Sequence, residues 1–314
     1  MFSLFNSRRK IISLTLTAIT VTIAVFIVSY QIVLKFAYTS DNIYYGKSQA
    51  AVAQELREEL MKMPDCTPVT FATSDHLTLK GFLFSRPHAI GNILLCHGYK
   101  GAKEFMYGLL EIFDNFNVFM FDFRASGESE GKYISLGYHE HKDVLAAARF
   151  FKARVPKNLP FIILGFSMGG GATLRAAAHN PGLAQAYIID SSFSDLRSMF
   201  LRGYALRVGL PYYPFFPVIQ SMFHHFADCN VDEVNSVAAV RMINEPIMFI
   251  HSCDDNFITP DHSIRLYANA LNEHSKVWIG PKARHGFLHA NYPALYHRKI
   301  LHFLKESIDL DYPS

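Results

Sequence analysis

Six short apolar runs constrain the fold of this chain more than any other feature. They are NILLCHG, NVFMFDFR, FIILGFS, AYIIDSS, PIMFIHS and KVWIGP, and helical patterns alternate with them. Continuous apolar strands are typical of a parallel sheet whose two faces are both covered by helices. An earlier segment, VTFATSDHLTLKGFLFS from Val69, alternates in polarity and breaks at Ser74-Asp75, as a hairpin would. We therefore predict an α/β fold with a mostly parallel eight-stranded sheet and helices on both faces.

Composition limits the classes of protein to which the chain can belong. It has 314 residues, of which 50% are hydrophobic, so it is long enough to bury a full core. Its formal net charge of +3 is spread without a long basic block, which gives no reason to expect a nucleic-acid partner. Its four cysteines show no CxxC spacing and are too few for a disulfide framework, so a zinc site is not expected.

The amino terminus indicates a membrane segment. After Arg8, Arg9 and Lys10, residues 11–34 carry no charge. Roughly 20 apolar residues span a bilayer core, whereas the apolar region of a signal peptide has about 7 to 15. We therefore expect a single-pass transmembrane helix, with a cytoplasmic amino terminus and the catalytic domain on the non-cytoplasmic side. A long signal peptide that is cleaved is the alternative.

These patterns divide the chain into three expected parts. Residues 1–37 form the cytoplasmic tip and the anchor, residues 38–68 form a stalk or connector, and residues 69–314 form the α/β domain. Residues 193–240 interrupt the strand and helix rhythm and predict a short lid. The lid side chains either line an apolar acyl pocket or pack the lid onto the domain: Tyr204, Leu210, Tyr212, Tyr213, Phe215 and Phe216.

A candidate nucleophile lies where an apolar strand passes into an alanine-rich helix. There GFSMG, residues 165–169, matches G-x-S-x-G, in which small neighbours let a serine adopt a strained turn above the sheet. A helix that begins at Met168 also directs free amides and its positive dipole end toward Ser167. A glycine-rich turn with an incidental serine is the alternative.

A serine hydroxyl is a weak nucleophile, so it needs a base and a group that orients the base. In hydrolases with the G-x-S-x-G turn, called the nucleophile elbow, the acid follows the serine along the chain and the histidine follows the acid. Asp255 follows the run PIMFIHS and is our first choice for the acid, with Asp190 and Asp254 as competitors. His285 lies directly after the last strand and is preferred as the base over His289, which is nearer the final helix.

The tetrahedral intermediate of acyl transfer also needs donors for its oxyanion, normally two backbone amides. Met168, which follows the serine, offers one of these amides. The stretch LLCHGYKG ends an early strand, and its Tyr99 offers the other. We expect the neighbouring His97 to be structural. A mechanism of this kind requires neither a metal nor an organic cofactor, and none is expected.

In this order the motifs resemble those of α/β-hydrolase-fold serine hydrolases, over nearly all of residues 69–308. The resemblance is carried by CHGYKG, DFRASGES, GFSMGG, HSCDDNFITP and ARHG. The anchor and the short lid are similar to those of the membrane-anchored Bem46-like branch. The resemblance implies a complete set of catalytic groups: Ser167 as nucleophile, Asp255 as acid, His285 as base, and the amides of Tyr99 and Met168 as the oxyanion hole.

The resemblance also implies the reaction. We expect hydrolysis of a carboxylic ester or thioester through an acyl-enzyme, with a small-molecule or lipid-like acyl substrate. Amide or peptide hydrolysis by the same triad and a noncatalytic binding protein on a hydrolase scaffold are the alternatives. Two residues depart from the family pattern, since Ala125 and Ser252 each replace a usual glycine.

Overall fold

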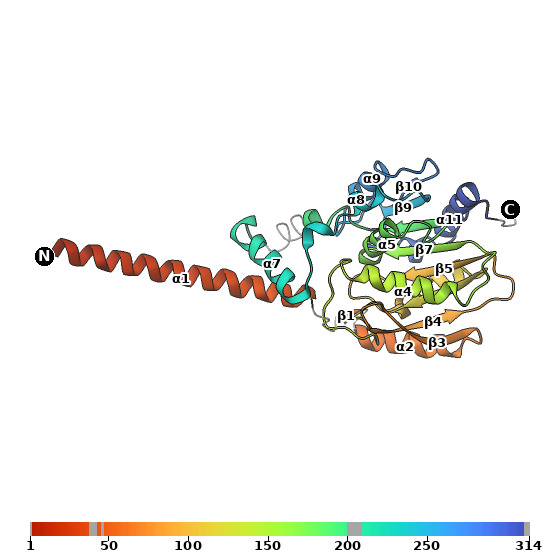
Figure 1. Cartoon of the computed structure of the whole chain (residues 1–314), viewed down its shortest axis with the longest axis horizontal. Coiled ribbons are helices and arrows are strands. Elements are labelled where there is room, and N and C mark those ends of the chain that lie inside the picture. The colour runs from red at the N-terminus through yellow and green to blue at the C-terminus, as the bar shows by residue number, and fades with distance from the viewer. Residues whose placement is uncertain (1, 38–42, 45–46, 200–208, 311–314) are drawn as a thin grey trace.

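The computed structural model describes residues 2–37, 43–44, 47–199 and 209–310. A long helix, α1 (Phe2–Ala37), projects from a layered α/β domain (Figure 1). Its segment Lys10–Leu34 contains an 18-residue window with a mean hydropathy of 2.5 and is long and apolar enough to cross a membrane. The chain therefore has a helix that fits the predicted anchor in length and composition.

The described part of the connector between α1 and the domain contains two short strands and a helix. The short strands β1 (Ile43–Tyr44) and β2 (Lys47–Ser48) pair antiparallel, and α2 (Gln49–Lys62) follows them. The Ser48 hydroxyl accepts the amide of Ala51 at 3.2 Å and so caps α2.

Eight strands form the central sheet, in the order β10-β9-β8-β7-β5-β6-β4-β3. The predicted apolar runs are the parallel strands β5 to β10, whereas β4 is antiparallel to both β3 and β6, so the sheet is mixed. The hairpin begins at Cys66 instead of Val69, because Cys66 already pairs with Phe84. The strands are β3 (Cys66–Ala72), β4 (Thr78–Phe84), β5 (Gly91–Cys96), β6 (Phe116–Phe121), β7 (Phe161–Phe166), β8 (Ala186–Asp190), β9 (Ile247–Ser252) and β10 (Lys276–Gly280).

Helices cover both faces of the sheet, as the apolar runs predict. Successive strand residues face different cores: in β7, Ile163 packs into one core, and Ile162 and Leu164 pack into the other. The first core is covered by α4 (Glu140–Lys152), α5 (Met168–His179), α8 (Ser236–Val240) and α9 (Asp261–Tyr267). The second is covered by α2, α3 (Leu109–Ile112), α10 (Leu288–Asn291) and α11 (Pro293–Ile308), with the short 3-10 helix η1 (Lys103–Met106).

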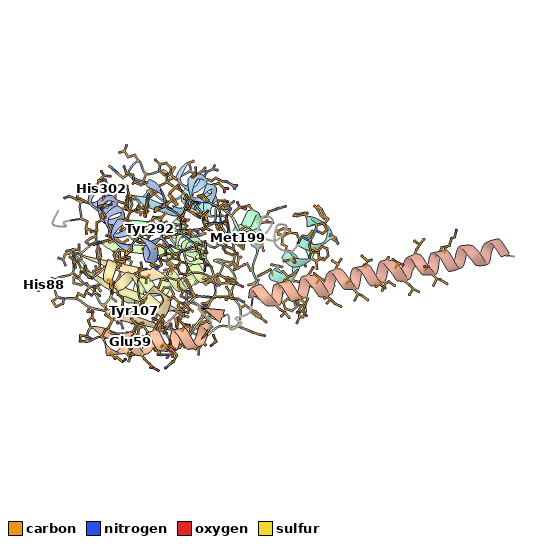
Figure 2. The ribbon with its side chains drawn as sticks, turned by 180° about the vertical axis from the view of Figure 1, so that it is seen from behind. Glu59, His88, Tyr107, Met199, Tyr292 and His302 are labelled. Atoms are coloured by element: carbon orange, nitrogen blue, oxygen red, sulfur yellow. The ribbon has the colours of Figure 1, made fainter. Side chains whose placement is uncertain are left out.

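The insertion after β8 contains helix α7 (Tyr212–Ala227), followed by η2 (Val231–Glu233) and α8. Helix α7 lies beside the end of α1, at the junction with the domain (Figures 1 and 2). Val33 of α1 and Phe216 of α7 are buried in the first core together with the strands of the sheet. The end of α1 is therefore packed into the domain, while its amino-terminal part projects away from it.

Candidate active site

Ser167 lies in the sharp turn between β7 and α5, with φ 50° and ψ −115°. A positive φ is strained for a residue other than glycine, and such strain is frequent at functional sites. The turn also requires glycine, because a Cβ added to Gly169 would lie 2.4 Å from the carbonyl oxygens of Cys96 and His97. The sequence prediction of a tight strand-to-helix turn is confirmed, and the turn exposes the hydroxyl at the carboxyl edge of the sheet.

A chain of hydrogen bonds joins Ser167 to a histidine and an acid from two other loops. The His285 Nε2 lies 3.0 Å from the Ser167 Oγ, and the His285 Nδ1 lies 2.7 Å from an Asp255 carboxylate oxygen. Asp255 follows β9 and His285 follows β10, so both loops leave the sheet at its carboxyl edge. The structure thus brings together the three side chains that the motifs nominated as nucleophile, base and acid.

The Asp255 carboxylate is held on both oxygens. Its Oδ1 accepts the amides of Phe257 at 2.9 Å and Ile258 at 3.1 Å, and its Oδ2 lies 3.2 Å from the Nε2 of the buried His251. Burial opposes ionisation, but hydrogen bonds from His251, His285 and the Phe257 amide outweigh it and hold the pKa of Asp255 well below its usual range. The carboxylate is therefore charged at neutral pH and can accept a hydrogen bond from the Nδ1–H of His285. Sequence reasoning assigned no role to His251, although this residue begins the motif HSCDDNFITP.

The competing residues have other partners. Asp190 is fully buried, accepts the Tyr296 hydroxyl at 2.9 Å and the Ser191 hydroxyl at 2.7 Å, and burial raises its pKa. Asp254 is exposed to solvent. The His289 ring packs against the Phe166 ring with 5.2 Å between centroids, and burial lowers the pKa of His289 to about 4. Among the competing acids and histidines, Asp255 and His285 alone share a hydrogen bond in the described part of the chain.

The loop expected to supply the first oxyanion donor lies beside the nucleophile. A Cβ added to Gly98 would be 3.5 Å from the Ser167 Cβ, an ordinary contact distance, so this backbone lies directly beside the nucleophile. Met168 is the first residue of α5, and the first amides of a helix have no acceptor within it. His97 is buried, with its Nε2 3.1 Å from the Phe123 amide and its Nδ1 2.7 Å from the Gly98 oxygen. Both ring nitrogens of His97 are thus used to hold the loop.

The DFRASGES loop supports the segment after Tyr99. The Asp122 carboxylate accepts the Lys103 amide at 2.8 Å and the buried Lys103 ammonium at 2.7 Å. Arg124 donates to Asp143 at 2.7 Å and to Asp75 at 2.9 Å. Burial opposes the charge of Lys103, but the neighbouring carboxylates outweigh it and raise the pKa of that ammonium. The pair between Lys103 and Asp122 therefore fixes the loop that follows the oxyanion segment, and the Arg124 pairs hold the DFRASGES loop itself.

The two departures from the family pattern have different structural outcomes. Ala125 adopts φ 52°, a conformation that glycine would adopt without strain. The buried Ser252 hydroxyl accepts the Ala283 amide at 2.8 Å and lies 2.8 Å from the Ala283 carbonyl oxygen, and it also accepts the Asp254 amide at 3.2 Å. Ser252 therefore ties the loop that carries Asp255 to the loop that carries His285, a role that its sequence position did not reveal.

Ser167 opens into a pocket of about 250 Å³. The pocket wall also includes Gln49, whose side-chain amide donates to the Lys100 carbonyl. Gln49 begins α2 and lies in the predicted connector, so sequence reasoning missed it. The apolar side chains of the pocket come from loops, from the 3-10 helix η1 and from the end of β7: Tyr99, Phe105, Met106, Phe166, Phe257 and Phe287.

None of the described lid residues lines this pocket. Of the two roles that the sequence left open, packing applies to the lid side chains that join the first core: Leu210, Tyr212, Phe215 and Phe216. Tyr213 is 72% exposed, and Tyr204 lies outside the described residues. Within the described ranges, no cluster of three or more His, Cys, Asp or Glu side chains could hold a metal.

Two solved structures with the same architecture are described as an esterase and a peptidase. The chain resembles an esterase from Pyrococcus furiosus with a TM-score of 0.66 and 21% identity, over 87% of this chain and 98% of the esterase. It also resembles an acylaminoacyl peptidase from Pyrococcus horikoshii with a TM-score of 0.59 and 18% identity, over 82% of this chain and 44% of the peptidase. These likenesses establish that the protein has the α/β-hydrolase fold.

Sequence comparison then identifies the family. The prolyl oligopeptidase family, Peptidase S9, matches residues 110–311, and the chain belongs to this family. YqkD of Bacillus subtilis is 27% identical over 74% of this chain and 76% of its own length. YfhR of Salmonella typhi is 25% identical over 88% of this chain and 90% of its own length. The α/β hydrolase domain-containing protein WAV2 of Arabidopsis thaliana is 27% identical over 49% of this chain and 48% of its own length.

Proposed function

We propose that this protein hydrolyses a carboxylic ester or thioester through a covalent acyl-enzyme on Ser167. The observation that carries the proposal is the continuous hydrogen-bond chain from Asp255 through His285 to Ser167, with separations of 2.7 and 3.0 Å. These separations are within hydrogen-bond reach and support the roles of nucleophile, base and acid.

In the first step, the Ser167 Oγ attacks the acyl carbonyl carbon while the His285 Nε2 takes the hydroxyl proton. The Asp255 carboxylate holds the Nδ1–H tautomer of His285 and stabilises the imidazolium that forms. The amides of Tyr99 and Met168 donate to the oxyanion. His285 then returns its proton to the leaving alcohol or thiol, and a water activated by the same imidazole releases the acid.

The pocket favours a short or aromatic acyl group over a long chain. Its volume of about 250 Å³ is near the lower limit for small-molecule sites, and most of its wall is apolar. Among the described residues of the wall, no carboxylate is available to bind a cationic substrate. A neutral acyl group fits this wall because it leaves no charge unpaired.

Amide or peptide hydrolysis is the second candidate, because the chain matches the prolyl oligopeptidase family. The same acyl-enzyme serves both reactions, and they differ in the leaving group that His285 must protonate. An amine is a poorer leaving group than an alcohol or a thiol. Comparing the hydrolysis rates of substrates that share one acyl group and differ in the leaving group therefore distinguishes an esterase from a peptidase.

The proposal also includes the predicted single-pass anchor, with the catalytic domain on the non-cytoplasmic side, and membership of the Bem46-like branch. The packing of α1 supports an anchor that is retained over a signal peptide that is cleaved. Val33 and Ala37 of α1 are fully buried, and the Ile134 amide donates to the Ala37 carbonyl at 2.8 Å. Cleavage after the apolar segment would remove Val33 from the folded core.

The decisive experiment uses the full chain in detergent with Ser167→Ala and, as the matched control, Ser307→Ala on α11. Labelling by a fluorophosphonate probe and hydrolysis of an acyl ester, thioester and aminoacyl amide are measured on each. We expect the wild type and Ser307→Ala to be labelled and to prefer the ester or thioester, and Ser167→Ala to lose both activities. Preference for the amide would support the peptidase, and an unlabelled, inert wild type would support the noncatalytic alternative.

A further inference from the structure

Helix α7 packs along the last turns of α1. The Tyr30 and Phe226 rings lie 5.8 Å apart, and Ser29 and Val33 are buried on the same side of α1. Residues 29 and 33 are four apart, so they share one face of the helix. The contact therefore follows a helical face and is continuous with the core of the domain.

This contact lies within the apolar span and not beyond it. The span runs from Lys10 to Leu34. At 1.5 Å per residue, Tyr30 is about 6 Å along the helix from Leu34, and Ser29 is about 7.5 Å from it. If α1 crosses the bilayer, the part of α7 that packs on these residues lies at the depth of the interface between headgroups and acyl chains.

The composition of α7 fits this depth. Residues 208–227 contain no Asp, Glu, Lys or Arg. No exposed position of α7 carries Asp, Glu, Lys or Arg. The exposed residues include Tyr213, Pro217 and Ser221, and the histidines His224 and His225. By contrast, the exposed face of α11 carries lysine and arginine, as is usual for a helix in water. Aromatic side chains are enriched where a membrane protein meets the headgroups.

The orientation of the sheet follows from the same contacts. Met199, in the insertion after β8, lies on the side of the domain near α1, whereas His88, which precedes β5, lies on the far side (Figure 2). Ile134, in the loop after β6, donates its amide to Ala37 at the end of α1. The parallel strands thus end toward α1 and begin away from it, and Ser167 lies at the edge where they end.

We propose that α7 and the last turns of α1 form one membrane-binding surface, and that the partner of this surface is the lipid of the leaflet nearest the catalytic domain. This inference rests on the anchor proposed above and is independent of the catalytic assignment. A membrane-binding surface at this position places the catalytic edge of the sheet toward the bilayer. Acyl substrates dissolved in the membrane would then reach the pocket without crossing the domain.

The test places a fluorescent reporter on the exposed face of α7. The chain has one tryptophan, Trp278 on β10, which provides the baseline in the wild type. The reporter is Ser221→Trp, and the control is Leu271→Trp, at an exposed site before β10, where the parallel strands begin. Each full-length variant is reconstituted into phosphatidylcholine vesicles with and without lipids that carry a nitroxide on the acyl chain, and flotation with the vesicles is measured in parallel.

We expect all variants to float, and the nitroxide lipids to quench the added fluorescence of Ser221→Trp several-fold more than that of Leu271→Trp. If both variants float but the lipids quench Ser221→Trp and Leu271→Trp equally, the role of α7 is overturned and the anchor is kept. This outcome is expected if water or a second copy of the chain covers α7. Failure to float would overturn the anchor and the membrane surface together. Neither result would alter the labelling of Ser167, so the catalytic proposal is tested separately.

Discussion

Ser252→Ala should weaken the connection between the acid loop and the base loop. The buried hydroxyl accepts the amides of Ala283 at 2.8 Å and Asp254 at 3.2 Å, and donates to the Ala283 carbonyl at 2.8 Å. Each net hydrogen bond contributes about 1 kcal/mol, so losing all of them should lower the free energy of unfolding by about 3 kcal/mol. At about 2 °C per kcal/mol for a domain of this size, the melting temperature should fall by about 6 °C.

Catalysis should also fall, because Ala283 lies two positions before His285 and Asp254 directly precedes Asp255. A displacement of about 1 Å in a catalytic group can cost about 100-fold in rate, so kcat for an activated ester should fall at least tenfold. The assay measures thermal unfolding by fluorescence, and kcat at a temperature well below either transition. Because the loops and not the pocket wall are loosened, KM should change less than kcat.

Ser126→Ala is the matched control for stability, since the Ser126 hydroxyl is buried and has no hydrogen-bond partner. Its removal should change the free energy of unfolding by less than about 0.5 kcal/mol, because no bond is lost. If Ser252→Ala melts at the same temperature as Ser126→Ala and keeps the wild-type kcat, the reasoning about the bridging hydroxyl is refuted.

Three further predictions follow from the site and its surroundings. Asp255→Asn should lower kcat by about 10⁴-fold, because the Asn oxygen stays on the two backbone amides and its NH2 group cannot accept a hydrogen bond from the His285 Nδ1–H. Asp190→Asn should leave kcat unchanged. Steady-state ester hydrolysis compares the two variants, and equal losses would contradict the assignment. Gly169→Ala should lower the free energy of unfolding by about 3 kcal/mol or more, because the new Cβ would lie 2.4 Å from two carbonyl oxygens. Thermal unfolding measures this loss, and an unchanged melting temperature would show that the elbow tolerates a side chain. Burial lowers the pKa of His289 to about 4, so the unfolded protein binds a proton near pH 6.5 and the folded protein does not, and the free energy of unfolding should fall as the pH decreases from about 6.5 to 4. His289→Phe should therefore reduce the drop in melting temperature between pH 7 and pH 5. If the drop is not reduced, it belongs to other groups.

Most of the sheet could be predicted because strand formation in its centre leaves a local pattern. Strands β5 to β9 are buried along their whole length, so each reads as an uninterrupted apolar run. The start of β3 was placed too late, at Val69 instead of Cys66. Because β3 is the edge strand and most of its side chains are exposed, its polarity pattern does not mark where pairing with β4 begins.

The candidate site was predictable only in part. Ser167 could be found locally, because the elbow needs small residues within two positions of the serine. The acid was not determined in this way, since Asp190, Asp254 and Asp255 all follow the ends of predicted strands. The choice depends on which carboxylate reaches the His285 ring, and that distance is set by how β8, β9 and β10 lie side by side.

By itself, the sequence determined the features that short-range chemistry controls: the apolar runs, the strained serine turn, the uncharged amino-terminal span and the order of the motifs. Only the tertiary structure decided that Asp255 is the partner of His285, that Ser252 joins their loops, that Gln49 of the connector lines the pocket, and that α7 packs on α1. Each of these depends on residues that are distant in the chain and meet only when the strands pair. Sequence periodicity records the environment of a residue but not the identity of its neighbours.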